Sequence, residues 1–318
     1  MKYYLGMDIG GTKCAVVLCE KNLNSVLDKI RFETKSSRGW RAVVDELVSS
    51  AKEIIERNSV SVDDVLACGI SCGGPLDSEK GIIMRPPNLP DWDNVPLTEI
   101  ITHELRIPSK VCNDADACAL AEWQFGAGKG CRNMVFLTFG TGMGAGLILD
   151  GKLYTGTCGT AGEVGHIRID SDGPVGYGKV GSFEGYCSGA GIATMAKKML
   201  SIYNGITTIP KDNVTALTVA QAAAGGDKLA NAIYRKCGEK LGLGISILID
   251  ILNPEMIVIG SIFERSGRLL VDTMTEMIKN EALSVSAQCC KIVPATLGDS
   301  IGDYAAIGVA KICAEEIK

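Results

Sequence analysis

Histidine, aromatic residues and long apolar runs are all scarce in this sequence. Only two of the 318 residues are histidines, His103 and His166, so the chain cannot build a metal site from several imidazoles. No apolar stretch reaches the roughly 18 residues that a membrane-spanning helix needs. The N-terminus leads directly into a strand-like run that carries Asp8, which is unlike a signal peptide. We therefore expect no multi-histidine metal site, no membrane span and no secretory leader.

Positive charge is neither abundant nor clustered. Lys and Arg number 32 against 37 Asp and Glu, which gives a net charge of -5 and a pI near 5.3. This balance argues against a nucleic-acid partner. The 13 cysteines are an odd number without a regular spacing, which in a chain of this length indicates reduced thiols in a cytoplasmic protein. We expect most to be small buried hydrophobes, among them Cys14, Cys68 and Cys112.

Apolar periodicity predicts an alternation of strands and helices in the first part of the chain. A helix is predicted where apolar residues recur at steps of three and four, from Trp40 to Ile55. A second helix is predicted over Ala115–Phe125. Short apolar or alternating runs predict strands over Tyr3–Ile9, Cys14–Cys19, Val26–Phe32, Val65–Ile70 and Lys110–Cys112.

From Asn133 the same order begins again. Strands are predicted over Met134–Phe139, Ala145–Leu149, Lys152–Thr155, Met256–Gly260 and Lys291–Val293. Helices are predicted over Gly191–Leu200, Ala216–Ala224, Asp227–Leu252, Glu264–Glu281 and Ile301–Ile317. The repetition predicts two related α/β domains, 1–115 and 116–300, with a ligand cleft between them and a closing helix, 301–318, that packs back on the first.

The first strand ends in a glycine turn, Asp8-Ile9-Gly10-Gly11-Thr12-Lys13. Backbone N–H groups of such a turn can approach phosphate oxygens because no Cβ stands in the way. Thr12 can donate its hydroxyl, and Asp8 can hold Mg²⁺ through water. The alternative is an ordinary hairpin turn.

A second glycine turn, Thr138-Phe139-Gly140-Thr141-Gly142-Met143-Gly144, ends another predicted strand. It fits a loose dinucleotide fingerprint, with Glu163 about 20 residues further on. That fingerprint opens a helix, whereas the residues after Gly144 resemble a return strand. The pattern therefore favours a phosphate-binding hairpin, and two such turns indicate a polyphosphate held from two sides.

Asn113-Asp114 follows a short predicted strand and is the best candidate for a catalytic base. Phosphoryl transfer needs alignment, charge neutralisation and a carboxylate that receives the hydroxyl proton. The alternative is that either residue caps the helix that follows, and position alone favours capping.

Polar residues that could bind sugar hydroxyls lie in loops. Glu163-Val164-Gly165-His166 places a carboxylate and an imidazole three residues apart, which suits hydroxyl groups or a metal ion. Asn88 and Glu184 carry no intrinsic signal, and His103 is expected to be a solvated surface residue.

Taken together, these segments resemble the ROK family of sugar kinases and repressors, which belongs to the actin-like ATPase superfamily. The resemblance covers nearly the whole chain. It rests on Asp8–Thr12, Pro87-Asn88-Leu89, Asn113-Asp114, Thr138–Gly142, Glu163–His166, Glu184 and Ser188-Gly189. It implies a two-domain α/β fold of the actin-like ATPase, or ribonuclease H-like, type with an interdomain cleft.

The resemblance also implies the roles of single residues. Asp114 would be the catalytic base that faces the sugar 6-hydroxyl. The other sugar ligands would be Gly74, Asn88, Asn113, Glu163, His166 and Glu184. ATP and Mg²⁺ would be held by Asp8, Gly10, Gly11, Thr12, Lys13, Thr138, Gly140, Thr141 and Gly142, with Gly189 and Gly260 near the adenosine.

One departure from the family pattern concerns a structural zinc site. Many members carry Cys-x-Cys-Gly-x-x-Gly-Cys-x-Glu, completed by the histidine of Glu-x-Gly-His. Here the three cysteine positions are Val175, Tyr177 and Ser182, and His166 alone cannot hold zinc. We therefore predict no zinc, and expect the loop to be ordered by packing of Tyr177 and Phe183.

The leading hypothesis is an ATP-dependent hexose kinase, with glucose favoured because Pro87–Trp92 resembles the glucokinase form of that loop. N-acetylmannosamine, N-acetylglucosamine, allose, fructose and β-glucosides lie within the family's range. A repressor or sugar sensor is the rival, although family repressors carry a DNA-binding extension before the first strand, which here begins by residue 3. An actin-like or Hsp70-like ATPase is the third alternative. The family also implies a homodimer.

Overall fold

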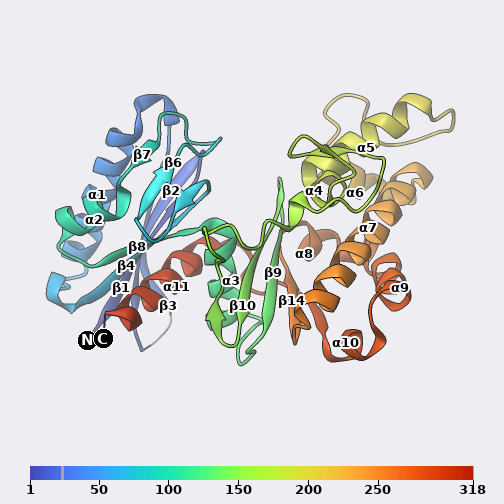
Figure 1. Cartoon of the computed structure of the whole chain (residues 1–318). Coiled ribbons are helices and arrows are strands. Elements are labelled where there is room, and N and C mark those ends of the chain that lie inside the picture. The colour runs from blue at the N-terminus through green and yellow to red at the C-terminus, as the bar shows by residue number, and fades with distance from the viewer. Residues whose placement is uncertain (23–24, 318) are drawn as a thin grey trace. The chain divides into compact units, whose positions relative to one another are not determined.

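The computed structural model describes residues 1–22 and 25–317, which form two compact units (Figure 1). Unit 1 comprises Met1–Gly130, Leu153–Ala161 and the residues from Asp299 onward. Unit 2 comprises Cys131–Lys152 and Gly162–Gly298. The first domain was expected to end at residue 115, whereas the first segment of unit 1 continues to Gly130 because the helix that begins at Asp114 packs on the C-terminal helix of the same unit.

Unit 1 is built on a five-stranded sheet of order β3-β2-β1-β4-β8. The first three strands are antiparallel, while β4 runs parallel to β1 and β8 parallel to β4. The strands are β1 (Tyr3–Ile9), β2 (Lys13–Glu20), β3 (Ser25–Glu33), β4 (Val65–Cys72) and β8 (Ser109–Asn113). All five were predicted to within a few residues.

The alternation along β1 divides its side chains between the two faces of the sheet. Leu5, Met7 and Ile9 are buried in the core that α1 (Trp40–Arg57) and α2 (Leu97–Leu105) help to form. Gly6 lies instead under α11 (Ile301–Glu316), where an added Cβ would come within 2.9 Å of the Ala306 Cβ. Asp8 therefore belongs to the α11 side of the sheet.

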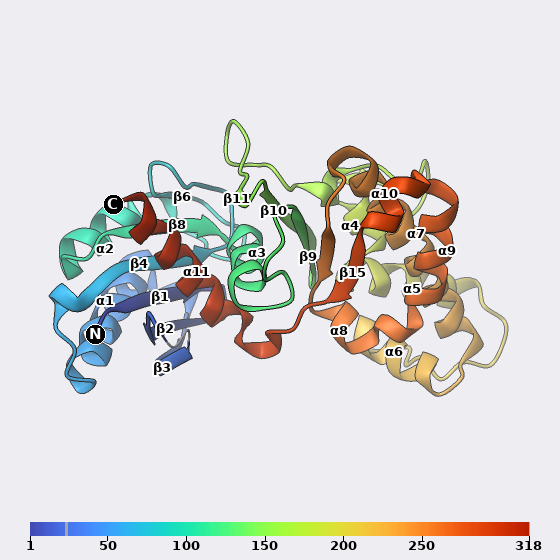
Figure 2. The same cartoon turned by 90° about the horizontal axis from the view of Figure 1, so that it is seen from below.

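Helices α11 and α3 (Asp114–Phe125) pack on each other, and α11 also packs on β1 and β4 (Figure 2). Gly69 permits this approach, because a Cβ there would lie 2.1 Å from the Ala306 carbonyl oxygen. A small sheet follows β4 and was not predicted. It contains β5 (Leu76–Asp77), β6 (Ile82–Met84) and β7 (Asp93–Val95), and the Asn88 loop joins the last two.

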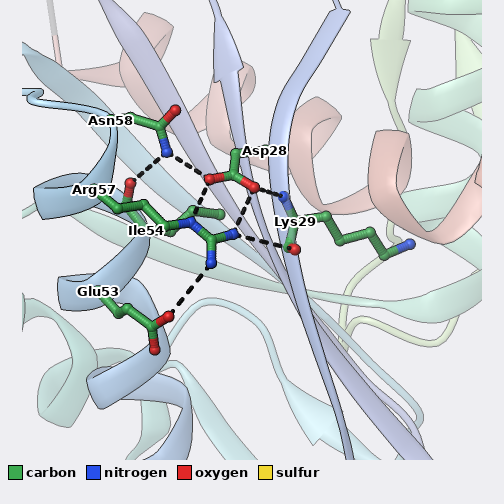
Figure 3. A network of polar contacts seen from close by, with 6 residues as sticks. All are labelled: Asp28, Lys29, Glu53, Ile54, Arg57 and Asn58. Atoms are coloured by element: carbon green, nitrogen blue, oxygen red, sulfur yellow. Dashed lines mark hydrogen bonds and ion pairs between the residues drawn. The ribbon is translucent and has the colours of Figure 1, made fainter.

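A polar network ties the end of α1 to β3 (Figure 3). Arg57 donates to both carboxylate oxygens of Asp28, at 2.6 and 2.5 Å, and the Asn58 amide donates to Asp28 at 2.6 Å. The Arg57 guanidinium and the Asn58 amide lower the pKa of Asp28 to about 2.

Unit 2 repeats the sheet of unit 1, with the order β11-β10-β9-β14-β15. β9 and β10 form an antiparallel hairpin, and β14 runs parallel to both β9 and β15. The strands are β9 (Met134–Phe139), β10 (Met143–Leu149), β11 (Lys152–Leu153), β14 (Met256–Ile259) and β15 (Lys291–Pro294). The predicted α/β class and the predicted internal repeat agree with this topology.

The helices of unit 2 largely follow the predicted pattern. They are α4 (Phe183–Tyr186), α5 (Gly189–Ile202), α6 (Ala216–Ala224), α7 (Lys228–Leu252), α8 (Ile262–Ser266), α9 (Val271–Glu281) and α10 (Ser284–Cys289). The single helix predicted over Glu264–Glu281 is wrong. A 3₁₀ turn over Gly267–Leu269 separates α8 from α9, since glycine disfavours a helix interior and the turn buries Leu270 completely.

Short elements complete the description. A small hairpin pairs β12 (Val175–Gly176) with β13 (Lys179–Val180), and further 3₁₀ turns cover Ser36–Arg38, Val62–Asp64, Val164–His166 and Gly298–Ser300. All 13 cysteines are free, and Cys14, Cys68 and Cys112 are buried as predicted. Among the described residues, no helix combines the length and apolarity that a bilayer crossing requires.

Candidate active site

The first glycine turn is the loop of the β1–β2 hairpin. Gly10 N donates to the Lys13 carbonyl at 3.0 Å, and the Thr34 hydroxyl donates to the Gly10 carbonyl at 2.6 Å. Gly11 lies against the Asn88 loop, since an added Cβ would be 2.7 Å from the Asn88 carbonyl oxygen. The exposed Thr12 and Lys13 side chains leave the outer face of the turn open to a ligand. The structure thus brings together Asn88 and the predicted phosphate turn.

Asp8 lies at the carboxyl end of β1, where α11 begins. A Cβ on Gly302 would be 2.6 Å from Asp8 Oδ2, so only glycine permits this approach of the helix. Asp303, in the first turn of α11, is buried and accepts two bonds from Lys29 Nζ, at 2.6 and 2.7 Å. Burial is the main cause that raises the pKa of Asp8 to about 6, and the charges of Asp303 and Asp114 add to it.

Asn113 and Asp114 lie where β8 passes into α3. The Ala115 amide donates to Asn113 Oδ1 at 3.0 Å and to Asp114 Oδ1 at 2.9 Å, so the pair does cap the helix. Part of Asp114 is nevertheless exposed to solvent, although protein atoms crowd around its carboxyl group. Burial raises its pKa, although the Ala115 amide opposes the shift. A carboxylate with these properties can accept a proton from a bound hydroxyl group.

Strand register explains why these groups meet. Asp8 pairs with Ser71, and Cys72 pairs with Asn113, so the carboxyl ends of three neighbouring parallel strands coincide. Gly74, just beyond β4, lies beside Asn113, because a Cβ on Gly74 would be 2.9 Å from Asn113 Nδ2. Within unit 1 the structure therefore assembles Asp8, Gly74, Asn113 and Asp114 at one edge of the sheet.

The second glycine turn is the loop of the β9–β10 hairpin, as predicted, and not the start of a helix. Gly140 N donates to the Gly142 carbonyl at 3.1 Å, and Gly144 N donates to Thr138 Oγ1 at 2.8 Å. Gly189 N, at the start of α5, donates to the Gly140 carbonyl at 2.8 Å. The turn therefore lies against the N-terminus of a helix, whose first amides bind the carbonyl groups of Gly140 and Thr141.

A cavity of about 480 Å³ adjoins this turn within unit 2. The residues that line it include Gly140, Thr141, Gly189 and Ser261, the residue that follows Gly260. Other lining residues that the sequence analysis missed include Thr215, Tyr234, Ile262 and Arg265. They belong to three different helices and their flanks and share no motif, so no sequence signal could have found them. Ser261 has a φ of +58°, which is uncommon for a residue other than glycine.

Glu184 contacts the other side of the same turn. Its Oε2 accepts a bond from Met143 N at 3.0 Å and would lie 2.7 Å from a Cβ on Gly142. Gly165 is close to Glu184 as well, since its added Cβ would be 3.2 Å from the Glu184 Cβ. The structure thus places the Glu163–His166 segment and Glu184 together, with Glu163 and His166 exposed.

The positions of the absent zinc cysteines have other roles. The ring of Tyr177 stacks on His166, with centroids 4.0 Å apart and planes inclined by 26°. Ser182 caps α4, and the Val175 side chain is exposed. Within the described part of the chain, no three His, Cys, Asp or Glu side chains form a group that could hold a metal ion. That no zinc binds in solution stays a prediction.

The remaining histidine is an exposed surface residue. His103 is on α2, its side chain is 85% exposed, and its Nδ1 lies 3.5 Å from a carboxylate oxygen of Glu104. This agrees with the predicted solvated surface residue. Asp303, in contrast, is a candidate that the sequence analysis did not name. The only sequence signal is an acid in the first turn of the last helix, and many surface helices share that feature.

The chain is similar to proteins of one family along nearly its whole length. The model of the ROK family matches residues 4–316. A glucokinase from Halalkalibacterium halodurans is 30% identical over 95% of this chain and 92% of its own, and a xylose repressor from Caldicellulosiruptor bescii is 29% identical over 93% of this chain and 74% of its own. A solved ROK family glucokinase from Streptomyces griseus, in complex with glucose and AMPPNP, has 27% identity and a TM-score of 0.74 over 98% of both chains. The predicted resemblance and the actin-like ATPase fold are confirmed.

Proposed function

Because the chain belongs to the ROK family, we propose that it is an ATP-dependent sugar kinase that phosphorylates the 6-hydroxyl of glucose or a close relative. The observation that carries the proposal is the environment of Asp114. Its carboxylate is accessible, has a raised pKa, and lies among Asp8, Gly74 and Asn113 at the carboxyl ends of parallel strands. The charge of Asp114 also helps to raise the pKa of Asp8, so the two carboxylates act in the same part of unit 1.

In the proposed mechanism Asp114 accepts the proton of the sugar hydroxyl as the γ-phosphoryl group is transferred. Asn113 and Asn88 donate or accept hydrogen bonds with the neighbouring hydroxyl groups, beside Gly74. In unit 2, Glu163, His166 and Glu184 bind further hydroxyl groups. The two sets provide acceptors and donors for a polyhydroxylated substrate, which fits a sugar better than an apolar acceptor.

We assign the phosphates of ATP to the two hairpin turns. Gly10 N and Gly140 N close the turns themselves, so the groups that would bind phosphate oxygens are the other backbone N–H groups and the hydroxyls of Gly10–Lys13 and Thr138–Gly142. Asp8 fits a Mg²⁺ ion bound through water, since Mg²⁺ prefers carboxylate and water oxygens and the charges of Asp303 and Asp114 act on the same carboxyl group. When bound, Mg²⁺ would neutralise charge on the phosphate oxygens. Gly189 and Gly260 flank the 480 Å³ cavity, which we assign to the adenosine.

Glucose is the first choice of substrate because the glucokinases are among the similar proteins. The 2-acetamido sugars, allose, fructose and β-glucosides remain alternatives, since none of the named contacts distinguishes them. A second candidate function is sugar sensing without catalysis, which the similarity to a xylose repressor supports. Sugar binding is common to both functions, so turnover must separate them.

The test is ADP release by the purified protein across a panel of hexoses and hexosamines. We expect sugar-dependent ADP release with wild type, and a fall in kcat of roughly 100- to 10,000-fold with Asp114→Asn, the usual contribution of a general base. The matched control is Asp272→Asn, an exposed carboxylate in the first turn of α9. Sugar binding should persist in both variants. Sugar binding by wild type without sugar-dependent turnover would instead favour the sensor, and near-normal activity of Asp114→Asn would exclude it as the base.

A further inference from the structure

The turn of the β12–β13 hairpin contains Tyr177, whose backbone conformation is unfavourable for a tyrosine. Val175 pairs with Val180 and Gly176 with Lys179, so Tyr177 and Gly178 are the two loop residues. Their φ angles are +51° and +69°, and positive φ at both loop residues is the requirement of a type I′ turn. Asn-Gly is the preferred sequence of such a turn, whereas a bulky aromatic residue at positive φ is an outlier.

The Tyr177 side chain has a specific partner that explains its presence. Its ring stacks on His166 at a centroid distance of 4.0 Å. Gly165 makes room for the ring, because a Cβ at that position would be 3.2 Å from Tyr177 Cε2. Lys179, on the other strand of the hairpin, donates to the His166 carbonyl at 2.6 Å. The hairpin therefore holds His166 by both its ring and its backbone.

Protein contacts hold the rest of the segment. Ser182 Oγ donates to the Gly176 carbonyl at 3.2 Å and accepts from Gly185 N at 3.1 Å. Phe183 is completely buried and lies against Gly244 of α7, where an added Cβ would be 2.4 Å from its ring. Val175 offers no donor atom, so this set of side chains does not fit a zinc ion.

We propose that Tyr177 is a positioning residue: its ring holds the His166 imidazole in the orientation that binds sugar, so sugar recognition by this chain needs no structural zinc. The link to sugar rests on the proposed function, while the stack itself does not. An aromatic pair contributes a modest free energy beyond the area that it buries, and it also defines a ring orientation. Tyr177 is then retained despite its unfavourable backbone conformation, because asparagine, which the turn prefers, could not form the stack.

Three variants separate the stack from the turn. Tyr177→Phe keeps the ring, Tyr177→Asn removes the ring but supplies the residue that the turn prefers, and Val175→Ala truncates an exposed side chain of the same hairpin as a control. We expect Tyr177→Asn to unfold at the same temperature as wild type or higher. Its KM for the sugar should rise roughly 2- to 10-fold, the effect of losing an aromatic pair, with little change in kcat or in the KM for ATP. Tyr177→Phe and Val175→Ala should match wild type.

Nuclear magnetic resonance of the histidine rings tests the stack without any assay of activity. The chain has only two histidines, and His103→Gln identifies the signals of His166 by elimination. The face of a stacked tyrosine shifts the ring protons of its partner upfield. We expect this shift in wild type and in Tyr177→Phe, and its loss in Tyr177→Asn. If no sugar is bound or turned over, the proposed function fails, and this measurement alone decides the positioning of His166.

Several results would overturn the inference. An unchanged sugar KM in Tyr177→Asn would show that Tyr177 serves only the turn, and an equal rise in Tyr177→Phe would exclude the ring as the cause. Absence of the upfield shift in wild type would show that there is no stack. A sugar KM that rises after treatment with a zinc chelator and restoration of Mg²⁺ would show that a metal holds the segment.

Discussion

The two glycine hairpins have the same strand connection but differ in the charge of their side chains. Each joins two antiparallel strands through three residues, Gly10-Gly11-Thr12 in unit 1 and Gly140-Thr141-Gly142 in unit 2. In each, a parallel strand lies beside the first strand of the hairpin, β4 in one unit and β14 in the other. The second-to-last residue of the first strand, however, is Asp8 in unit 1 and Thr138 in unit 2.

The surroundings extend this difference. Asp8 lies near two further carboxylates, Asp303 and Asp114, and its pKa is raised to about 6. Thr138 uses its hydroxyl to bind the amide of Gly144 in its own hairpin. The first turn thus concentrates negative charge that a cation can relieve, whereas the second offers neutral donors. A duplicated scaffold can therefore carry different chemistry through one residue at an equivalent position.

The largest expected effect comes from removing the charge that distinguishes the hairpins. Asp8→Asn should lower kcat/KM for ATP roughly 100-fold or more, because charge stabilisation by a bound metal ion is worth several kcal/mol. Thr138→Val should lower it roughly 10-fold or less, since it removes hydrogen bonds of about 0.5–1.5 kcal/mol each. Steady-state kinetics over a range of Mg²⁺ concentrations checks both. Equal effects would mean that the hairpins do not differ in function.

The same Asp8→Asn variant should gain stability in a pH-dependent way. The folded-state pKa of Asp8 is about 6, above the usual value for an unfolded aspartate, so the charged form disfavours the folded state. This cost is present above about pH 6 and disappears toward pH 4, where the carboxyl is protonated in both states. Asp8→Asn should raise the free energy of unfolding by an amount on the order of 1–3 kcal/mol at pH 7.5, and by little at pH 4. Urea unfolding at the two pH values measures this, with Thr138→Val as a variant that should show no such pH dependence.

Steric room should also differ between the turns. A Cβ on Gly11 would meet the backbone oxygen and the Cβ of Asn88 at 2.7 and 2.8 Å, whereas a Cβ on Gly142 would meet only the flexible end of Glu184 closely, at 2.7 Å. Gly11→Ala should therefore lower the free energy of unfolding by about 1–3 kcal/mol, and Gly142→Ala by less than about 1 kcal/mol. The Gly142 variant should instead raise the KM for the sugar by displacing Glu184. Chemical denaturation and kinetics would contradict this comparison if Gly142→Ala proved the less stable of the two.

The smallest effect is expected at Asp28, a carboxylate of the same unit whose pKa is shifted in the opposite direction from that of Asp8. Arg57 and Asn58 lower the folded-state pKa of Asp28 to about 2, so its stabilisation is complete above the unfolded value near pH 4 and is lost as the pH falls through 2 (Figure 3). Asp28→Asn should therefore lower the melting temperature slightly at pH 7 and not at pH 2. Activity should not change. A gain in stability at pH 7, as expected for Asp8→Asn, would contradict the assignment.

Local periodicity made most of the fold predictable. The strands around both hairpins and the helices α1, α6 and α7 depend on apolar patterns within a few residues, and these were recognised. The predicted helix across Gly267 was wrong because burial of Leu270 overrides the local apolar pattern. The β5–β7 sheet and α10 were not predicted, since strands of two or three residues and a helix of six residues carry too little pattern.

For the candidate site, residue chemistry identified the members but not their neighbours. Asp8, Asp114 and the two turns could be named because their types and positions suit phosphoryl transfer. The capping role of Asn113 was one of the alternatives, and the structure shows it without deciding on catalysis. Asp303 carries only the unspecific signal of an acid in the first turn of a helix, and the relevance of both Asp303 and Ser261 depends on which segment lies beside them.

The amino-acid sequence by itself determined the duplicated order of strands and helices, the two glycine turns, and the exchange of a carboxylate for a hydroxyl between them. These follow from short-range pattern and side-chain chemistry. Only the tertiary structure decided that Asp303, 274 residues from its partner Lys29, lies beside Asp8, and that Tyr177 covers His166. Contacts between residues so far apart, or across a turn that local preference disfavours, arise from the packing of whole elements, and no local pattern specifies them.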